Sequence, residues 1–406
     1  MSNLRLHLSE PRIARRVKPK MPLGRHLVEA GAIQSNDLVH ALDMQRHVDA
    51  PLGEILIAEG LAGREDVMIA LSEQYHAQLV DLERDPPQDG LANRLPVSLC
   101  LQYRAVPWLD MAGTLLVATS RPHEFDALRT ALGARVQTIL PVIAEEQQIK
   151  DQISNLYGAE LAHKAATRVP AAVSCRTWDI SSTVRGLWAL AFITPVLIAT
   201  VIAPLWTLTI AMLWAVMTLV ATTTLKAAAL WVQIVHKAPE APVPFVPRRD
   251  LPYRLPMVSV LVPLLEEKEI TGALISRLSK LTYPKSQLEV VLVLEAGDRV
   301  TRETLSHTEL PPWISVIEVP EANQLTTKPR ALNYALDFCR GQIVGVWDAE
   351  DAPAPDQLHR VVRRFHERGP DVACLQGILD YYNSGTNWLS RCFTIEYAAW
   401  FRVMLP

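Results

Sequence analysis

The chain has 406 residues and a formal net charge of −3, so its length suits two or three domains and its charge does not favour nucleic acid as a partner. Its five cysteines lie far apart, without the spacing of a metal site or a disulfide framework. This pattern is typical of reduced cytosolic thiols. We expect no cleavable signal peptide, because the first residues contain no apolar stretch.

Residues 1–20 are strongly basic, with six Lys or Arg side chains against Glu10 alone. A disordered, solvated arm explains this composition, and contact with anionic lipid is the alternative. Either reading places the segment outside the first folded domain.

The next segment repeats itself after 29 residues. The first copy reads Pro-Leu-Gly-Arg-His-Leu-Val-Glu-Ala-Gly from Pro22, and the second reads Pro-Leu-Gly-Glu-Ile-Leu-Ile-Ala-Glu-Gly from Pro51. Each copy continues into helically spaced Leu and Ala residues that end at a glutamine, Gln45 or Gln74. Because a glycine break precedes that stretch, the sequence predicts two short helices in each repeat.

This pattern, Leu-Gly-x-x-Leu-x-x-x-Gly followed by a spaced Leu, Ala-Leu and Gln, resembles the N-terminal domain of type II secretion and pilus ATPases. The similarity continues to about residue 158, through 75–82, 103–107 and 115–119, which correspond to the α/β second half of that domain. The chain is not itself such an ATPase, because it contains no Gly-x-x-x-x-Gly-Lys-Ser/Thr loop. We therefore expect residues 21–160 to form a regulatory domain of this type.

In some members of that family the repeated motif binds cyclic di-GMP, and a domain that docks only protein is the alternative. Pro22 and Pro51 stand where the family's motif begins with arginine. Proline at these positions removes a guanidinium that can stack on guanine or form two hydrogen bonds to one phosphate. Binding in the micromolar range is therefore expected. The resemblance implies the following contact residues: Leu23, Gly24, Gly31, Gln45, Leu52, Gly53, Gly60 and Gln74.

A linker at 161–184 leads to forty residues, 186–225, without a charged side chain. This is about twice the ~20 residues that one helix needs to cross a bilayer. Pro204 divides the run, so the sequence predicts a transmembrane hairpin within 185–235. Buried helices of a soluble core are the alternative.

The orientation of the hairpin follows from its basic flanks. The 203–207 turn has no basic residue, and the positive-inside rule then places both termini in the cytoplasm. The flanking basic residues are Arg176, Arg185, Lys226, Lys237, Arg248 and Arg249. A proline-rich spacer at 236–256 follows.

From residue 257 strands and helices alternate. Apolar runs at 257–263, 288–294, 313–319 and 342–347 predict buried strands. Helical patterns lie between them, at about 270–281 and 328–339. This alternation predicts a doubly wound, mostly parallel sheet.

Polar residues lie where such sheets bind ligands, at the carboxyl ends of the strands. Lys328 opens the run Thr-Lys-Pro-Arg-Ala-Leu-Asn-Tyr-Ala, and Asp348-Ala349-Glu350-Asp351 follows the last strand. Clustered carboxylates suit a divalent cation that carries a diphosphate. A helix cap with solvated charges is the alternative, since Pro353 and Pro355 follow.

The order of these motifs is similar to the donor-binding half of family 2 processive glycosyltransferases, the cellulose-synthase-like group with a GT-A fold. The resemblance implies a UDP-sugar site and a Mg²⁺ or Mn²⁺ ion. The residues implied at the UDP-sugar are Pro263, Glu266, Glu295 and Lys328. Those implied at the metal, in place of an Asp-x-Asp motif, are Asp348, Glu350 and Asp351.

We therefore expect an α/β multidomain protein: a small α plus α/β N-terminal domain, a two-helix transmembrane hairpin, and a partial GT-A domain at 257–406. The expected activity is inverting hexosyl transfer from a UDP-sugar to an extracellular polysaccharide acceptor. The expected location is the bacterial inner membrane, with cyclic di-GMP as regulator, export or co-synthase proteins as partners, and no nucleic acid.

The alternative is a catalytically incomplete, nucleotide-binding receptor or scaffold. The family's base motif, Thr-Glu-Asp, and its acceptor motif, Gln-x-x-Arg-Trp, do not occur in the sequence. The resemblance therefore implies a catalytic base beyond Pro406, and we expect no glycosyl transfer by these 406 residues alone.

Overall fold

The computed structural model describes residues 21–133, 138–174, 183–236, 253–267, 270–321, 326–381 and 384–405. The basic arm at 1–20 and most of the proline-rich spacer lie outside these residues, as do Arg176, Lys237, Arg248 and Arg249. The chain forms two compact units. The first combines Met1–Ala165, Tyr253–Ile275 and Tyr283–Ala349, and the second combines Ala166–Pro252, Ser276–Thr282 and Glu350–Pro406.

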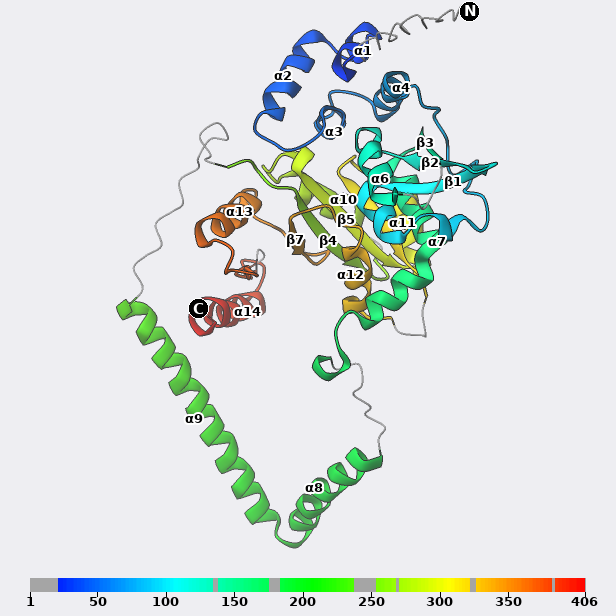
Figure 1. Ribbon diagram of the computed structural model, residues 1–406. Coiled ribbons are helices and arrows are strands. Elements are labelled where there is room, and N and C mark those ends of the chain that lie inside the picture. Colours follow the sequence, from blue (N-terminus) through cyan, green and yellow to red (C-terminus); the bar gives the residue numbers. More distant parts are fainter. Residues whose placement is uncertain are drawn as a thin grey trace, which may run out of the picture. The chain divides into compact units, whose positions relative to one another are not determined.

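The two sequence repeats fold as two matching helix pairs (Figure 1). The first pair is α1 (Leu23–Glu29) and α2 (Ser35–Gln45), and the second is α3 (Leu52–Ala58) and α4 (Arg64–Tyr75). The prediction of two short helices in each repeat is confirmed.

The repeats also share their backbone geometry at the glycine that ends each first helix. Gly31 has φ +73° and Gly60 has φ +71°, values that an L side chain adopts only with strain. The backbone N–H of Ala32 donates to the carbonyl of Leu27 at 2.9 Å, and Leu61 N–H donates to Leu56 at 2.8 Å. The two copies are thus related in three dimensions as well as in sequence.

Gly24 and Gly53 allow helices to pack closely in the repeats. A Cβ at Gly24 would collide with the side chain of Leu38. A Cβ at Gly53 would lie 3.0 Å from Cγ1 of Val67 and 3.2 Å from Cδ2 of Leu23. Larger side chains at these two positions would therefore disturb the repeat core itself.

The second half of the N-terminal region is an α/β layer. Its three-stranded sheet has the order β1-β2-β3, with β1 antiparallel to β2 and β2 parallel to β3. The elements are η1 (Leu91–Arg94), α5 (Val97–Tyr103), β1 (Ala105–Met111), β2 (Thr114–Thr119), η2 (Pro122–Glu124), α6 (Phe125–Leu132), β3 (Thr138–Ile143) and α7 (Glu146–Thr167).

Four parallel strands form the second sheet, in the order β6-β5-β4-β7. The strands are β4 (Val258–Leu264), β5 (Leu288–Glu295), β6 (Ile314–Val319) and β7 (Ile343–Val346). The helices that follow them in the sequence are α10 (Ile270–Ser279), α11 (Arg299–Ser306), α12 (Lys328–Leu336) and α13 (Gln357–Arg368), with a 3-10 turn, η7 (Lys285–Gln287), before β5. The predicted doubly wound parallel sheet is confirmed.

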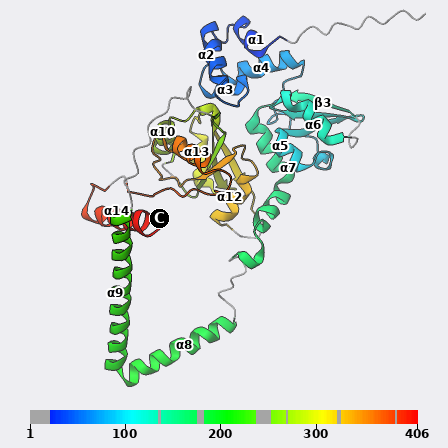
Figure 2. The ribbon, with the colours of Figure 1, turned by 60° about the vertical axis from the view of Figure 1, so that its left-hand side comes forward.

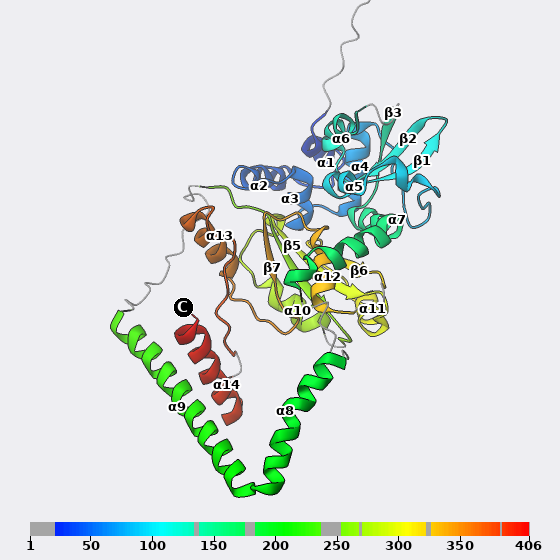
Figure 3. The ribbon, with the colours of Figure 1, turned by 60° about the horizontal axis from the view of Figure 1, so that its bottom comes forward.

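The N-terminal region and the parallel sheet share one hydrophobic core. Buried residues of α7, such as Ile149 and Leu161, belong to the same cluster as Leu261 and Val291 of the sheet. Helix α7 runs beside α12 (Figure 3), and the hydroxyls of Tyr334 and Ser154 lie 3.2 Å apart. The first compact unit is therefore built jointly by the two regions, which the sequence had suggested as separate domains.

The second unit contains the two apolar helices, α8 (Thr183–Ile202) and α9 (Pro204–His236). Thr183–Ile202 and Pro204–Val232 are long and apolar enough to cross a membrane, and none of their apolar residues is buried. Figure 2 shows the two helices joined by a short turn and splayed apart. Further along the chain, α14 (Trp388–Ala399) leads into a π-helical turn at Trp400–Met404, and Glu396 pairs with Lys226 of α9 at 2.8 Å.

Candidate functional site

The strand order of the parallel sheet reverses between β4 and β7, because β5 and β6 lie on one side of β4 and β7 lies on the other. Open α/β sheets bind ligands at such a point, outside the carboxyl ends of the strands. The backbone N–H of Trp347 donates to the carbonyl of Leu261 at 3.0 Å. This bond places Asp348, the next residue, beside the end of β4.

Lys328 and Asp348 meet at this edge of the sheet. Lys328 is the first residue of α12, and its ammonium forms an ion pair with the Asp348 carboxylate. The two side chains are 50% and 48% exposed, so both remain accessible to a ligand. The sequence predicted both residues, and the structure brings them together.

Glu295, which the sequence placed at the base or ribose, is held by an arginine. Its carboxylate lies 3.0 Å from Nη1 of Arg330 on α12, and Arg330 also donates to the carbonyl of Pro320. Burial raises the pKa of Glu295, and Arg330 opposes that rise. The pair therefore joins β5 to α12 and fixes the helix that carries Lys328.

Asp298 is a site residue that our sequence reasoning missed. Its carboxylate caps α11 by accepting from Thr301 N–H at 3.0 Å, and it accepts from the backbone N–H of Glu266 at 2.8 Å. Glu266 has φ +54°, so the hydrogen bond supports a strained turn after β4. Burial alone would raise the pKa of Asp298, but these hydrogen bonds outweigh burial and lower it. An Asp three residues before Thr301 was the available capping signal.

The metal prediction concerns Asp348, Glu350 and Asp351. Among the described residues, no three His, Cys, Asp or Glu side chains gather closely enough to hold a metal by themselves. Mg²⁺ needs only one or two carboxylates, since diphosphate oxygens and water complete its octahedron. Asp348, in the first unit, can therefore supply one carboxylate to a cation that arrives with its diphosphate, whereas Glu350 and Asp351 belong to the second unit.

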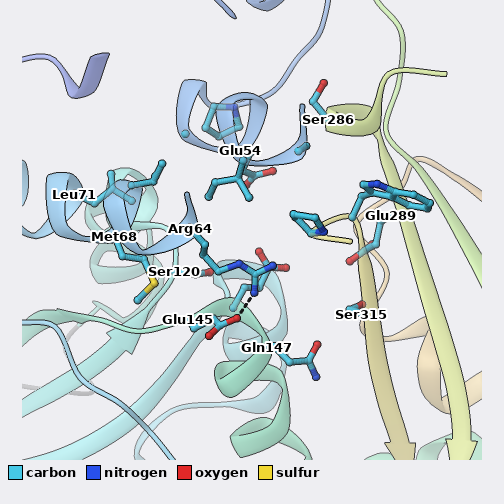
Figure 4. A pocket seen from close by; sticks show the side chains of 18 of the residues that line it. Glu54, Arg64, Met68, Leu71, Ser120, Glu145, Gln147, Ser286, Glu289 and Ser315 are labelled. Atoms are coloured by element: carbon cyan, nitrogen blue, oxygen red, sulfur yellow. Dashed lines mark hydrogen bonds and ion pairs between the residues drawn. The ribbon is translucent and has the colours of Figure 1, made fainter. Parts of the chain in front are cut away.

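A second candidate site is a cavity of about 510 Å³ in the first unit. Figure 4 shows Leu71, Met68 and Arg64 of α4 on one wall, and Glu289 and Ser315 of the parallel sheet on the other. Of the residues implied at cyclic di-GMP, four line this cavity: Leu23, Leu52, Gly53 and Gln74. The other four, Gly24, Gly31, Gln45 and Gly60, do not line it; Gln45 donates to the carbonyl of Ala50 at 3.1 Å.

A cluster of buried charges borders the cavity and joins the N-terminal region to the sheet. Glu289 of β5 is 3% exposed and accepts from Lys150 of α7 at 3.1 Å and from Ser259 Oγ at 2.8 Å. Arg340, which follows α12, lies 3.4 Å from Glu289 and 2.9 Å from Glu54 of α3. No pattern in the sequence predicted this cluster.

The stability of this cluster should depend on pH. Burial alone would raise the pKa of Glu289, but Lys150, Arg340 and Arg104 lower it from 4.5 to about 2. Because the folded state depresses this pKa, the contribution of Glu289 is full above about pH 4.5 and is lost as pH falls toward 2. The melting temperature of the whole chain should therefore fall as the pH is lowered from 4.5 toward 2. In Glu289→Gln the melting temperature should depend less steeply on pH over this range. An equally steep pH dependence in the variant would show that Glu289 does not cause the loss of stability in acid.

Two family models match parts of the chain. Residues 75–163 match the MshEN domain model, and residues 256–404 match the model described as glycosyltransferase like family 2. The chain carries an MshEN domain and a family 2 glycosyltransferase domain. Both resemblances drawn from the sequence are thereby confirmed.

Among curated relatives, a probable glucomannan 4-beta-mannosyltransferase 1 of Arabidopsis thaliana is 30% identical over 147 residues, covering 34% of this chain and 26% of the relative. The beta-monoglucosyldiacylglycerol synthase of Trichormus variabilis is 31% identical over 120 residues, covering 29% of this chain and 25% of the relative. The chain thus spans about a quarter of the length of these relatives.

Solved structures are also similar to parts of the chain. The structure of MshE with cdg is 27% identical in sequence and has a TM-score of 0.32. The match covers 34% of this chain and 99% of the MshE chain. The mannosyltransferase PcManGT of Pyrobaculum calidifontis, in complex with GDP-Man and Mn2+, is 28% identical in sequence and has a TM-score of 0.28. The match covers 40% of this chain and 48% of the PcManGT chain.

Proposed function

We propose that the chain binds a nucleoside-diphosphate sugar at the carboxyl edge of its parallel sheet and serves glycosyl transfer at a membrane. The observation that carries this proposal is the accessible ion pair of Lys328 and Asp348 at the point where strand order reverses. The pair offers a cation to a diphosphate and a carboxylate to a metal. A family 2 glycosyltransferase domain covers both residues.

The site would act mainly by binding and orienting the donor. The Lys328 ammonium and the N-terminal end of α12 would both face the diphosphate, since helix N-termini favour anions. Pro263 and Glu266, at the end of β4, would border the nucleoside, and Asp298 would hold the Glu266 backbone in place. A divalent cation on Asp348 would stabilise the negative charge of the departing nucleotide.

The motifs favour a UDP-sugar as donor, and the similarity to mannosyltransferases makes GDP-mannose the competing donor. We propose that transfer inverts the anomeric carbon and extends an extracellular polysaccharide, with export or co-synthase proteins as partners. Helices α8 and α9 would anchor the chain in the bacterial inner membrane. Arg185 and Lys226 lie toward the outer ends of this pair, which supports cytoplasmic termini.

We further propose cyclic di-GMP as the regulator. The ligand has two chemically equivalent halves, and the repeats present two equivalent surfaces with matching glycine geometry at Gly31 and Gly60. Leu23 of the first repeat and Leu52 and Gln74 of the second reach one cavity. That arrangement supports one dinucleotide bound by both repeats.

Calorimetry of the purified full chain tests the donor proposal. We expect UDP or GDP to bind in the presence of Mg²⁺ or Mn²⁺ and to lose affinity in a chelator, because the cation links Asp348 to the diphosphate. AMP, which has no diphosphate, is the control. Failure of both diphosphates to bind would contradict the proposal.

A further inference from the structure

We propose that the glycosyltransferase domain completes the regulatory site, so that the cyclic dinucleotide contacts the parallel sheet as well as the repeats. This inference rests on the proposed function of the repeats and adds the second wall of their site. It assigns a binding role to Lys285, Ser286 and Trp313, none of which belongs to the donor motifs.

The lining of the cavity supplies the first argument. Leu23 of the first repeat and residues of α3 and α4 of the second line one side, and Lys285 and Ser286 of η7 line another together with Trp313, which directly precedes β6. Helix α3 of the second repeat contacts η7 directly. A volume of about 510 Å³ lies within the range of small-molecule sites. A ligand held by the second repeat would therefore touch the catalytic domain.

The chemistry of that second wall suits a nucleobase and a phosphodiester. The Lys285 ammonium lies 4.8 Å from the centroid of the Trp313 ring, which places a cation and an aromatic surface side by side. Pro51, which replaces the family's arginine, lines the same cavity. A cation from the catalytic domain could thus replace the missing guanidinium, because both can pair with a phosphate.

Ser286 adds an independent sign of a ligand. It is 3% exposed, and its Oγ has no hydrogen-bond partner among the described residues. A buried hydroxyl without a partner costs free energy, and such groups are uncommon in native proteins. Ser286 lines the cavity, so rotation of its side chain about χ1 would bring the hydroxyl to a phosphate oxygen or a base edge there.

Occupation of this site would affect the donor site through α12. Glu54 lies next to Gly53 on the cavity wall and pairs with Arg340 at 2.9 Å. Arg340 follows α12, whose first residue is Lys328. Because one helix connects the two sites, the ligand should change donor affinity, and by linkage the donor should change ligand affinity by the same factor.

The test is calorimetry of cyclic di-GMP with the full chain and its variants. We expect Lys285→Gln and Ser286→Val each to weaken binding about tenfold, as the loss of one charged or buried hydrogen bond predicts, and Lys285→Arg to retain it. Lys280→Gln, an exposed lysine outside the cavity lining, is the matched control. Unchanged binding of UDP or GDP by each variant shows that the fold is intact.

The possible failures are distinct. If the wild-type chain does not bind cyclic di-GMP, both the regulatory function and this inference are wrong. If the wild type binds and Lys285→Gln and Ser286→Val bind equally well, the repeats form the site alone and only this inference is overturned. If saturating cyclic di-GMP leaves the affinity for the donor nucleotide unchanged, the coupling through α12 is wrong.

Discussion

Asp348→Ala should abolish the metal-dependent part of donor binding. The affinity of the variant for UDP or GDP with Mg²⁺ should fall to the value that the wild type shows in a chelator, because Asp348 is the carboxylate that we assign to the cation. The fold should be little affected, since the ion pair with Lys328 is about half exposed and such pairs contribute at most about 1 kcal/mol. Calorimetry with and without metal measures both affinities.

Asp126→Ala provides the matched control for this change. Asp126 is 89% exposed, and it forms an ion pair with an arginine on its own helix, α6. Its replacement removes one carboxylate and one surface ion pair without touching the sheet edge. Metal-dependent binding of equal strength in Asp348→Ala and in this control would show that another residue holds the metal.

Glu289→Ala should strongly destabilise the first compact unit. The change removes the carboxylate that lies 3.1 Å from the Lys150 ammonium and 3.4 Å from the Arg340 guanidinium, and it leaves them only the more distant Glu146 in common. Lys150 is 3% exposed, so water cannot replace the lost partner. Removing one partner of a buried ion pair costs about 3–5 kcal/mol. We expect a clearly lower melting temperature for the chain. Thermal unfolding monitored by tryptophan fluorescence measures it.

Two variants make this result specific. Glu303→Ala removes an exposed glutamate of α11 and should change stability by less than about 0.5 kcal/mol. The double change of Lys150 and Glu289 to methionine and leucine should recover part of the loss, because apolar residues can replace a buried pair. A melting temperature close to the wild type in Glu289→Ala would mean that the cluster contributes little.

The sequence was sufficient for features that depend on local patterns. Runs such as 288–294 are apolar enough to predict a buried strand, and the structure has β5 there. The helical spacing of Leu and Ala in the repeats that begin at Pro22 and Pro51 likewise predicted a pair of helices in each repeat. The order of Lys328 and Asp348 along alternating elements predicted the sheet edge at which they meet.

Features that depend on contacts between distant residues could not be predicted in this way. Glu289 lies in an apolar strand, and its buried carboxylate accepts a hydrogen bond from Lys150, 139 positions earlier in the chain. Arg330 lies two residues after Lys328 in the donor motif, and it is 3% exposed and pairs with Glu295. Periodicity assigns a face to a residue but does not name the partner across that face.

The core that α7 shares with the parallel sheet has a consequence for how this protein can be engineered and how it can evolve. A regulator attached by a tether can be deleted to leave a permanently active enzyme. Here deletion of residues 1–165 would strip α7 from the sheet and expose Tyr334 and Phe338, both 0% exposed in the intact chain. Truncation should therefore yield an insoluble fragment, and variants that alter the proposed regulation without unfolding the sheet should be point substitutions at the boundary between the two regions.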